Sequence, residues 1–208
     1  MAANSDIDAG RFPHLAAYVA VLPQGLDSYT ECRSRATLVT SALEGHDIGA
    51  LAAALPEPLR DLAEHPPLPG AWVPAAHSDA LFHALVDLHY PTLEAMLAWT
   101  RQRTHRTARS RMYRALTRMT GPKMVLKTSA VVHGMFQRGT HLTATPSEGG
   151  LLLRLEHPPY LHYGWNHHSN VGMFEVLVEI AAGAPGRVAL LDSQPGFALY
   201  SAHWHELG

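Results

Sequence analysis

Histidine is the residue type in this chain with the widest choice of chemistry. Fifteen of the 208 residues are His, and neutral imidazoles gathered in threes bind zinc, copper or iron. Several fall between residues 157 and 168. Near the C-terminus His203 and His205 are two apart, so on a strand they share one face. The predicted metal ligands are His162, His167, His168, His203 and His205.

Aromatic side chains accompany these histidines and favour a second interpretation, a binding site for a hydrophobic or planar small molecule. His133, in a predicted helix, is either an axial ligand to a planar cofactor or a hydrogen-bonded core histidine. The segment 157–168 is a metal or haem site, a polar loop over a pocket, or ordinary surface. The candidate ligand-binding residues are Trp72, Tyr160, Tyr163, Trp165 and His133.

Cations are concentrated in the middle of the sequence. Residues 95–147 contain ten Lys and Arg and no Asp or Glu, although the whole chain has a net charge of −2. Because Arg binds phosphate or carboxylate through two parallel hydrogen bonds, this stretch predicts an anion site or a contact with a partner. The alternative is a solvated helix face that pairs with the chain's own acids. The candidate residues are Arg103, Arg106, Arg111, Arg114 and Arg118.

Several classes of protein find little support in the sequence. There is no Gly-x-Ser-x-Gly, phosphate loop or dinucleotide fingerprint, and no helix-turn-helix or RNA-binding motif, so nucleic acid is not the expected partner. Cys32 is the single cysteine, which excludes an internal disulfide and favours a reducing compartment. Without an apolar run of about 18 residues or a secretory signal, we expect a soluble, cytoplasmic protein.

The elements that must position these residues follow from hydrophobic periodicity. A period of 3.6 predicts helices over 29–44, 48–55, 57–64, 78–90, 92–102, 106–120 and 123–137. After Gly139 the period becomes 2. This predicts a hairpin of 140–145 with 151–156, a loop over 158–166, a helix over 170–182, and strands over 187–192 and 197–203.

This order predicts an α+β protein, with N-terminal helices packed against a small antiparallel sheet of β-β-α-β-β order. We expect residues 1–55 to form a helical extension. Residues 56–208 would form the α+β ligand-binding-like domain, and the two parts would make one compact unit.

Residues 56–204 resemble a paralogous family of myxobacterial proteins. The resemblance is carried by Trp72-Val73-Pro74, Met112-Tyr113-Arg114, Gly121-Pro122, Gly139 and the terminal Trp204. That family is distantly similar to 4-vinyl reductase domains, haem nitric-oxide-binding domains and Bet3-like subunits. The resemblance implies helices on a small antiparallel sheet, with a hydrophobic or planar molecule bound between the layers. The Tyr-x-Ser-x-Arg signature of the haem nitric-oxide sensors is absent from this sequence.

The sequence therefore favours a non-enzymatic small-molecule-binding or sensory module. The first alternative is a His-ligated metal- or haem-binding protein, with possible enzymatic activity. The second is a scaffold that oligomerises through its charge asymmetry. A homo-oligomer or an acidic protein is the partner that the basic stretch suggests.

Overall fold

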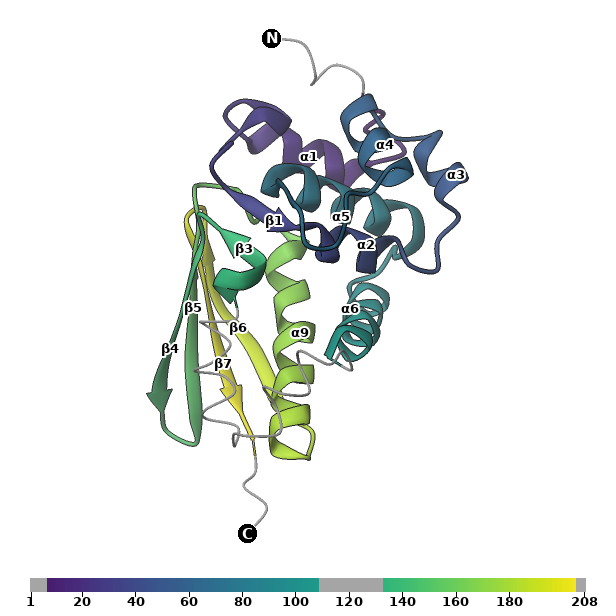
Figure 1. Ribbon diagram of the computed structural model, residues 1–208. Coiled ribbons are helices and arrows are strands. Elements are labelled where there is room, and N and C mark those ends of the chain that lie inside the picture. The colour runs from purple at the N-terminus through teal and green to yellow at the C-terminus, as the bar shows by residue number, and fades with distance from the viewer. Residues whose placement is uncertain (1–6, 109–132, 205–208) are drawn as a thin grey trace.

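The computed structural model describes residues 7–108 and 133–204. The first of these ranges is mainly helical (Figure 1). Its elements are α1 (Pro13–Val21), a 3₁₀ turn (Gly25–Asp27), β1 (Arg33–Arg35), α2 (Ala36–Leu43), α3 (Ile48–Ala52), α4 (Glu57–Glu64), β2 (Trp72–Pro74), α5 (Ala75–His89) and α6 (Leu93–Ala108). The second range contains β3 (Gln137–Arg138), β4 (His141–Ser147), β5 (Gly150–Glu156), α9 (Trp165–Ala182), β6 (Arg187–Gln194) and β7 (Phe197–His203).

The larger sheet has the strand order β4-β5-β7-β6, and all its pairs are antiparallel. Helix α9 covers one face (Figure 1). Alternate residues of β5 turn toward that helix, because side chains on a strand alternate between its two faces. Leu151, Leu153 and Leu155 are buried, and the Phe174 ring of α9 lies 5.3 Å from that of Tyr200 on β7. The predicted α+β class and the β-β-α-β-β order are confirmed.

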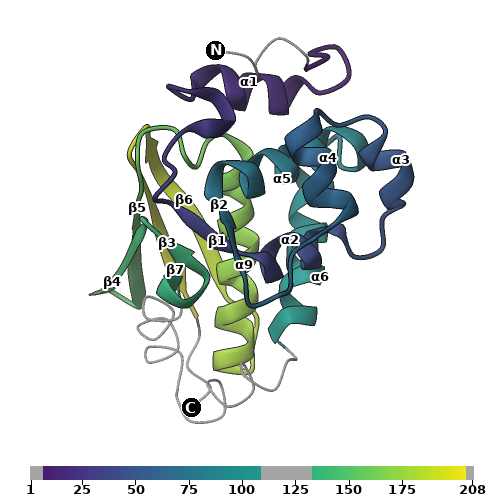
Figure 2. The same ribbon diagram turned by 45° about the horizontal axis from the view of Figure 1, so that its top comes forward.

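A second, three-stranded sheet was not predicted. It has the order β2-β1-β3 and lies between the helices and the larger sheet (Figure 2). Arg33 to Arg35 pair with Trp72 to Pro74, so the helix predicted over 29–44 begins only at Ala36. The hydrogen bonds that impose the strand come from residues about forty positions away, which a local periodicity cannot register.

The helices enclose a core of their own, with α5 at its centre. Leu81 and Leu85 of α5 are buried among residues of α1, α2 and α6. The carboxylate of Asp87 accepts hydrogen bonds from the backbone N–H groups of His14 and Leu15, at 3.1 and 3.0 Å. These are orphan donors of the first turn of α1. This core unites helices on both sides of residue 55, and the predicted domain boundary there stays a prediction.

Two helix boundaries differ from the prediction in ways that affect the site. Helix α6 continues without a break to Ala108, and α9 begins at Trp165 rather than at residue 170. Most of the helices predicted over 106–120 and 123–137 lies outside the described residues, as do Arg111, Arg114, Arg118 and His205. In the described part of the chain, no helix is both long and apolar enough to cross a membrane.

Candidate ligand-binding cavity

A cavity of about 140 Å³ lies where the helical layer meets α9 and the larger sheet. Its apolar lining includes Leu38, Val39, Leu81, Phe82, Phe174 and Leu177. Its polar lining includes Asp79, Arg103, His133, Gln137, His162 and Asn166. The lining residues come from both described ranges of the chain. An apolar space with a few convergent polar groups is the usual form of a small-molecule site.

A short polar contact in the wall joins Asp79 of α5 to His162 of the loop before α9. Asp79 Oδ2 lies 2.6 Å from His162 Nδ1, and both side chains are almost completely buried. On the other side of the ring, His162 Nε2 lies 3.1 Å from Gln137 Oε1. An amide oxygen only accepts hydrogen bonds, so Nε2 carries a proton. The pair is then electrically neutral whether the shared proton is on Nδ1 or on the carboxylate.

Gln137 is connected to His133 through hydrogen bonds of the Thr140 hydroxyl. The hydroxyl of Thr140 donates to Gln137 Oε1 at 3.2 Å, and His133 Nε2 lies 2.8 Å from that hydroxyl oxygen. Burial, followed by the effect of His162, lowers the pKa of His133 to about 4. His133 is therefore a neutral imidazole in the cavity wall at neutral pH.

Two more histidines surround His162 outside the cavity lining. The ring centroids of His157 and His162 are 5.0 Å apart, and His167 Nε2 lies 3.3 Å from His157 Nε2. Burial, then His162, lowers the pKa of His157 to about 3 and that of His167 to about 4. Only one of two facing nitrogens can donate, which fits a pair of neutral rings.

Arg103 brings a positive charge to the wall from α6. Its guanidinium carbon lies 4.9 Å from the centroid of the Trp99 ring. Burial, then the neighbouring Arg106, lowers the pKa of Arg103 to about 10, so it is still a cation at neutral pH. We expected Arg103 on an anion-binding or partner-binding helix face, and the structure places it in the cavity wall.

The described members of the predicted metal site fall into two separate places. His162, His167 and His168 lie near the start of α9. His203 is at the far end of β7, where it pairs with Gly150 (Figure 1). Among residues 7–108 and 133–204, no group of three or more His, Cys, Asp or Glu is placed to hold a metal ion. His203 is separated from the others because it lies at the opposite end of the larger sheet, and the predicted metal site stays a prediction.

Of the five predicted ligand-binding residues, only His133 lines the cavity. Trp72 lies between the guanidinium groups of Arg35 and Arg138, at 4.0 and 4.1 Å from its ring. The Trp165 ring lies 4.5 Å from that of His14 on α1. Tyr160 and Tyr163 pack partly buried against the helical core. These aromatic side chains hold layers together, and none of the four reaches the cavity.

The residues that sequence reasoning missed are Asp79, Gln137 and Asn166. Asp79 offered one usable signal, because it is an acid in a helix and is followed directly by Ala80, Leu81 and Phe82. Buried acids are rare unless they are paired. Gln137 and Asn166 offered no comparable signal, since amides are common on protein surfaces.

Comparison with known proteins rests on structure alone. No protein-family model matches the sequence, and no curated protein matches it. An H-NOX protein from K. algicida superposes with a TM-score of 0.59 at 9% identity, over 83% of this chain and 97% of that chain. An oxygen-binding H-NOX domain related to soluble guanylate cyclases superposes with a TM-score of 0.54 at 12% identity, over 80% and 89%.

The fold is that of the H-NOX domains. A third structure, from work on haem distortion in the H-NOX family, agrees with a TM-score of 0.57 at 9% identity, over 81% of this chain and 92% of that chain. At identities this low, the superpositions show a shared fold and do not show a shared function. The predicted resemblance to haem nitric-oxide-binding domains is thus confirmed at the level of fold. The resemblances to myxobacterial proteins, 4-vinyl reductases and Bet3-like subunits stay predictions.

Proposed function

We propose that this chain is a non-enzymatic small-molecule-binding or sensory module, and that the cavity between its layers is the binding site. The observation that carries the proposal is the cavity itself. Its volume of about 140 Å³ is close to that of an engineered apolar cavity of about 150 Å³ that binds benzene. A molecule with one ring or a short branched chain matches this space.

The arrangement around the cavity supports binding rather than catalysis. His162 has an orienting carboxylate, as a general base often does, but its other nitrogen faces the amide of Gln137 and not a hydroxyl or thiol. A nucleophile within hydrogen-bonding reach of the base is the feature that nucleophilic catalysis requires. Burial raises the pKa of Cys32 to about 11, which makes it a poor nucleophile at neutral pH.

Haem is the second candidate ligand, because the structural neighbours are H-NOX proteins and a neutral histidine, His133, lies in the cavity wall. The fit of this wall to haem is incomplete. His133 Nε2 is bound to Thr140, and both nitrogens of His162 are in use. A porphyrin is also several times larger than benzene. Holding haem would require His133 to leave Thr140 and the cavity to widen.

The binding function is tested by filling the cavity. Ala42 lines it and is buried, so Ala42→Leu places a larger side chain in the space. Ala98→Leu, on the exposed side of α6, makes the same change away from the cavity. We expect a panel of one-ring probes (indole, phenol and phenylacetate) to raise the melting temperature of the wild type and of Ala98→Leu, but not of Ala42→Leu. Equal responses in all three proteins would remove the proposal.

A haemin titration separates the two candidates. If haem is the ligand, the wild type binds one equivalent with a sharp Soret band, and His133→Ala changes or abolishes that band. If the cavity binds only a smaller molecule, haemin gives the same broad spectrum with both proteins.

A further inference from the structure

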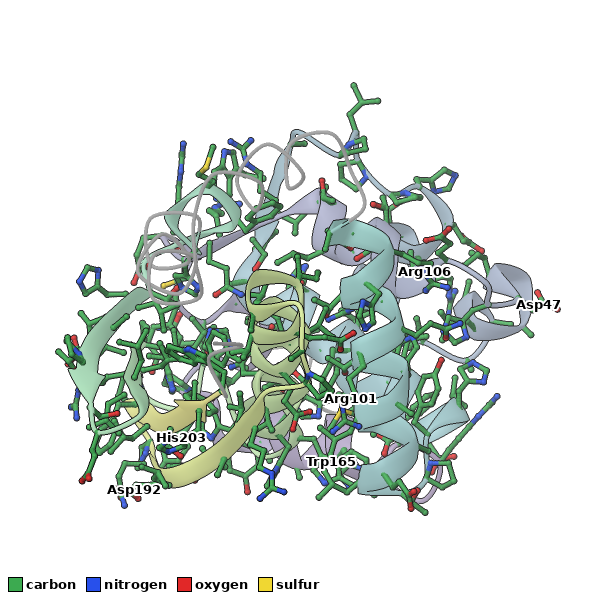
Figure 3. The ribbon with its side chains drawn as sticks, turned by 90° about the horizontal axis from the view of Figure 1, so that it is seen from below. Asp47, Arg101, Arg106, Trp165, Asp192 and His203 are labelled. Carbon is green, nitrogen blue, oxygen red and sulfur yellow. The ribbon has the colours of Figure 1, made fainter. Side chains whose placement is uncertain are left out.

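Among its described residues, the cavity wall carries one more positive charge than negative charge. The other two arginines of α6 have carboxylate partners. Arg101 Nη2 lies 2.6 Å from Glu175 Oε2 of α9, and Arg106 Nε lies 3.6 Å from Glu44 Oε2. Figure 3 shows Arg101 between α6 and α9, with Arg106 elsewhere on the same helix. Arg103 has no carboxylate partner within the described residues.

The other ionisable groups of the wall do not balance Arg103. Asp79, the acid in the lining, shares a proton with His162. The pair is neutral because His162 Nε2 carries a second proton, which it donates to Gln137. His133 is uncharged at neutral pH. The segment 109–132, which follows α6, contains no Asp or Glu. Its amino acids therefore provide no carboxylate that could approach Arg103.

The Arg103 side chain is half-buried. Burial of a guanidinium without a counter-charge is unfavourable, because it removes hydration that the Trp99 ring replaces only in part. Its planar fork matches a carboxylate, and their paired hydrogen bonds are stronger where water is excluded. The remaining wall is mostly apolar, with Leu81 and Phe82 from α5 and Phe174 and Leu177 from α9. These surfaces suit a hydrocarbon body and not a second charged group.

We propose that the ligand of this cavity is a small monocarboxylate with an apolar body, and that Arg103 binds its carboxylate. This rests on the proposed binding function of the cavity and adds the chemical class of the ligand. Among the described lining residues, Arg103 is the one cation without a carboxylate partner, so a single carboxylate is the charge that this part of the wall matches.

The test compares acids with their uncharged isosteres. Phenylacetate and isovalerate are titrated by calorimetry into the wild type, alongside phenylacetamide and isovaleramide. A hydrogen-bonded charge pair predicts that each acid binds about 10- to 100-fold tighter than its amide. Arg103→Gln should remove this preference. Arg103→Lys, which keeps the charge without the fork, should retain only part of it.

Arg106→Gln is the matched control, since it removes a cation one turn away that already has a partner. It should leave the preference for acids over amides intact. If acids and amides bind equally to the wild type, the proposed ligand class is wrong, while the binding function stands. If no probe of either kind binds, both fail. The comparison of acid with amide in the wild type is informative even if Arg103→Gln does not fold.

Discussion

Helix α5 carries two aspartates about two turns apart, and each contacts a histidine from a distant part of the chain. Asp87 lies 2.5 Å from His14, and Asp79 lies 2.6 Å from His162. Asp87 also accepts two backbone N–H groups at the start of α1. Asp79 has no donor other than His162 among the described residues, and it lines the cavity.

The difference lies in what each pair does for the fold. Asp87 satisfies helix-end donors that would otherwise lose their hydrogen bonds, so its place is explained by the needs of the backbone. Among the described residues, Asp79 is hydrogen-bonded to His162 and His162 to Gln137, at the edge of the cavity. Replacing a buried ion pair by apolar residues is often neutral or stabilising. A buried pair that the fold does not need is therefore the better indicator of function. The expected difference between the Asp79 pair and the Asp87 pair can be measured by substitution.

The largest effect should come from the same substitution made at the two histidines. His162→Phe leaves Asp79 buried without a partner, so we expect the free energy of unfolding at pH 7 to fall by about 3–5 kcal/mol. His14→Phe should cost only about 1 kcal/mol, since Asp87 keeps its backbone donors. Urea denaturation measures both. The double variant Asp79→Leu/His162→Phe should recover most of the loss, and equal losses for the two single variants would contradict the contrast.

Substitution of the aspartates should reverse the order. Asp87→Ala removes the acceptor for two N–H groups of α1, and we expect a loss of about 2–3 kcal/mol. Asp79→Ala removes one hydrogen-bond partner of His162, which keeps its contact with Gln137, and should cost about 1–2 kcal/mol. Chemical denaturation of both variants at pH 7 provides the comparison. A larger loss for Asp79→Ala than for Asp87→Ala would show that the cavity pair also supports the fold.

The buried histidines predict loss of stability in acid. Burial lowers the pKa of His83 to about 3 from its ordinary value of 6.5. Between these values the unfolded chain binds a proton that the folded chain does not. The stability that His83 contributes is complete above pH 6.5 and falls by about 1.4 kcal/mol per pH unit below it. That amounts to about 2 kcal/mol at pH 5.

His83→Phe should remove this share of the pH dependence. Neither ring nitrogen of His83 is hydrogen-bonded to a described side chain or carbonyl within ordinary bonding distance, and its ring already packs against Tyr18 and Phe82. We expect little change at pH 7 and a shallower decline toward pH 5, measured by thermal unfolding across that range. An unchanged slope would mean that other groups, such as His157 and His167, account for the decline.

The smallest effect on stability should come from the partly exposed ion pair between Arg101 and Glu175. Glu175→Gln breaks the ion pair of Arg101, whose side chain is 41% exposed. A pair of this kind contributes about 0.5 kcal/mol, and less at high salt. Unfolding at low and high salt would measure the contribution. A loss above about 2 kcal/mol would show that the contact between α6 and α9 depends on this pair more than on its apolar packing.

The sequence alone determined the elements with strong local patterns. The change of period at Gly139 predicted the hairpin, which is observed as β4 and β5. The last two strands and the helix before them were also predicted, although that helix begins five residues earlier than expected. These succeeded because neighbouring positions on one element share one environment, so alternation and helical spacing are visible locally. The absence of acids over residues 95–147 was equally plain in the sequence, and it leaves Arg103 without a carboxylate from that stretch.

Only the tertiary structure decided which residues meet. Asp79 and His162 are 83 positions apart, and the cavity lining runs from Leu38 to Leu177. Arg103 lines the cavity, whereas Arg101 and Arg106 pair with carboxylates, although all three lie on one helix. Such contacts depend on the packing of whole layers. Hydrophobic periodicity says which face of a helix is buried, but not which distant side chain lies opposite it.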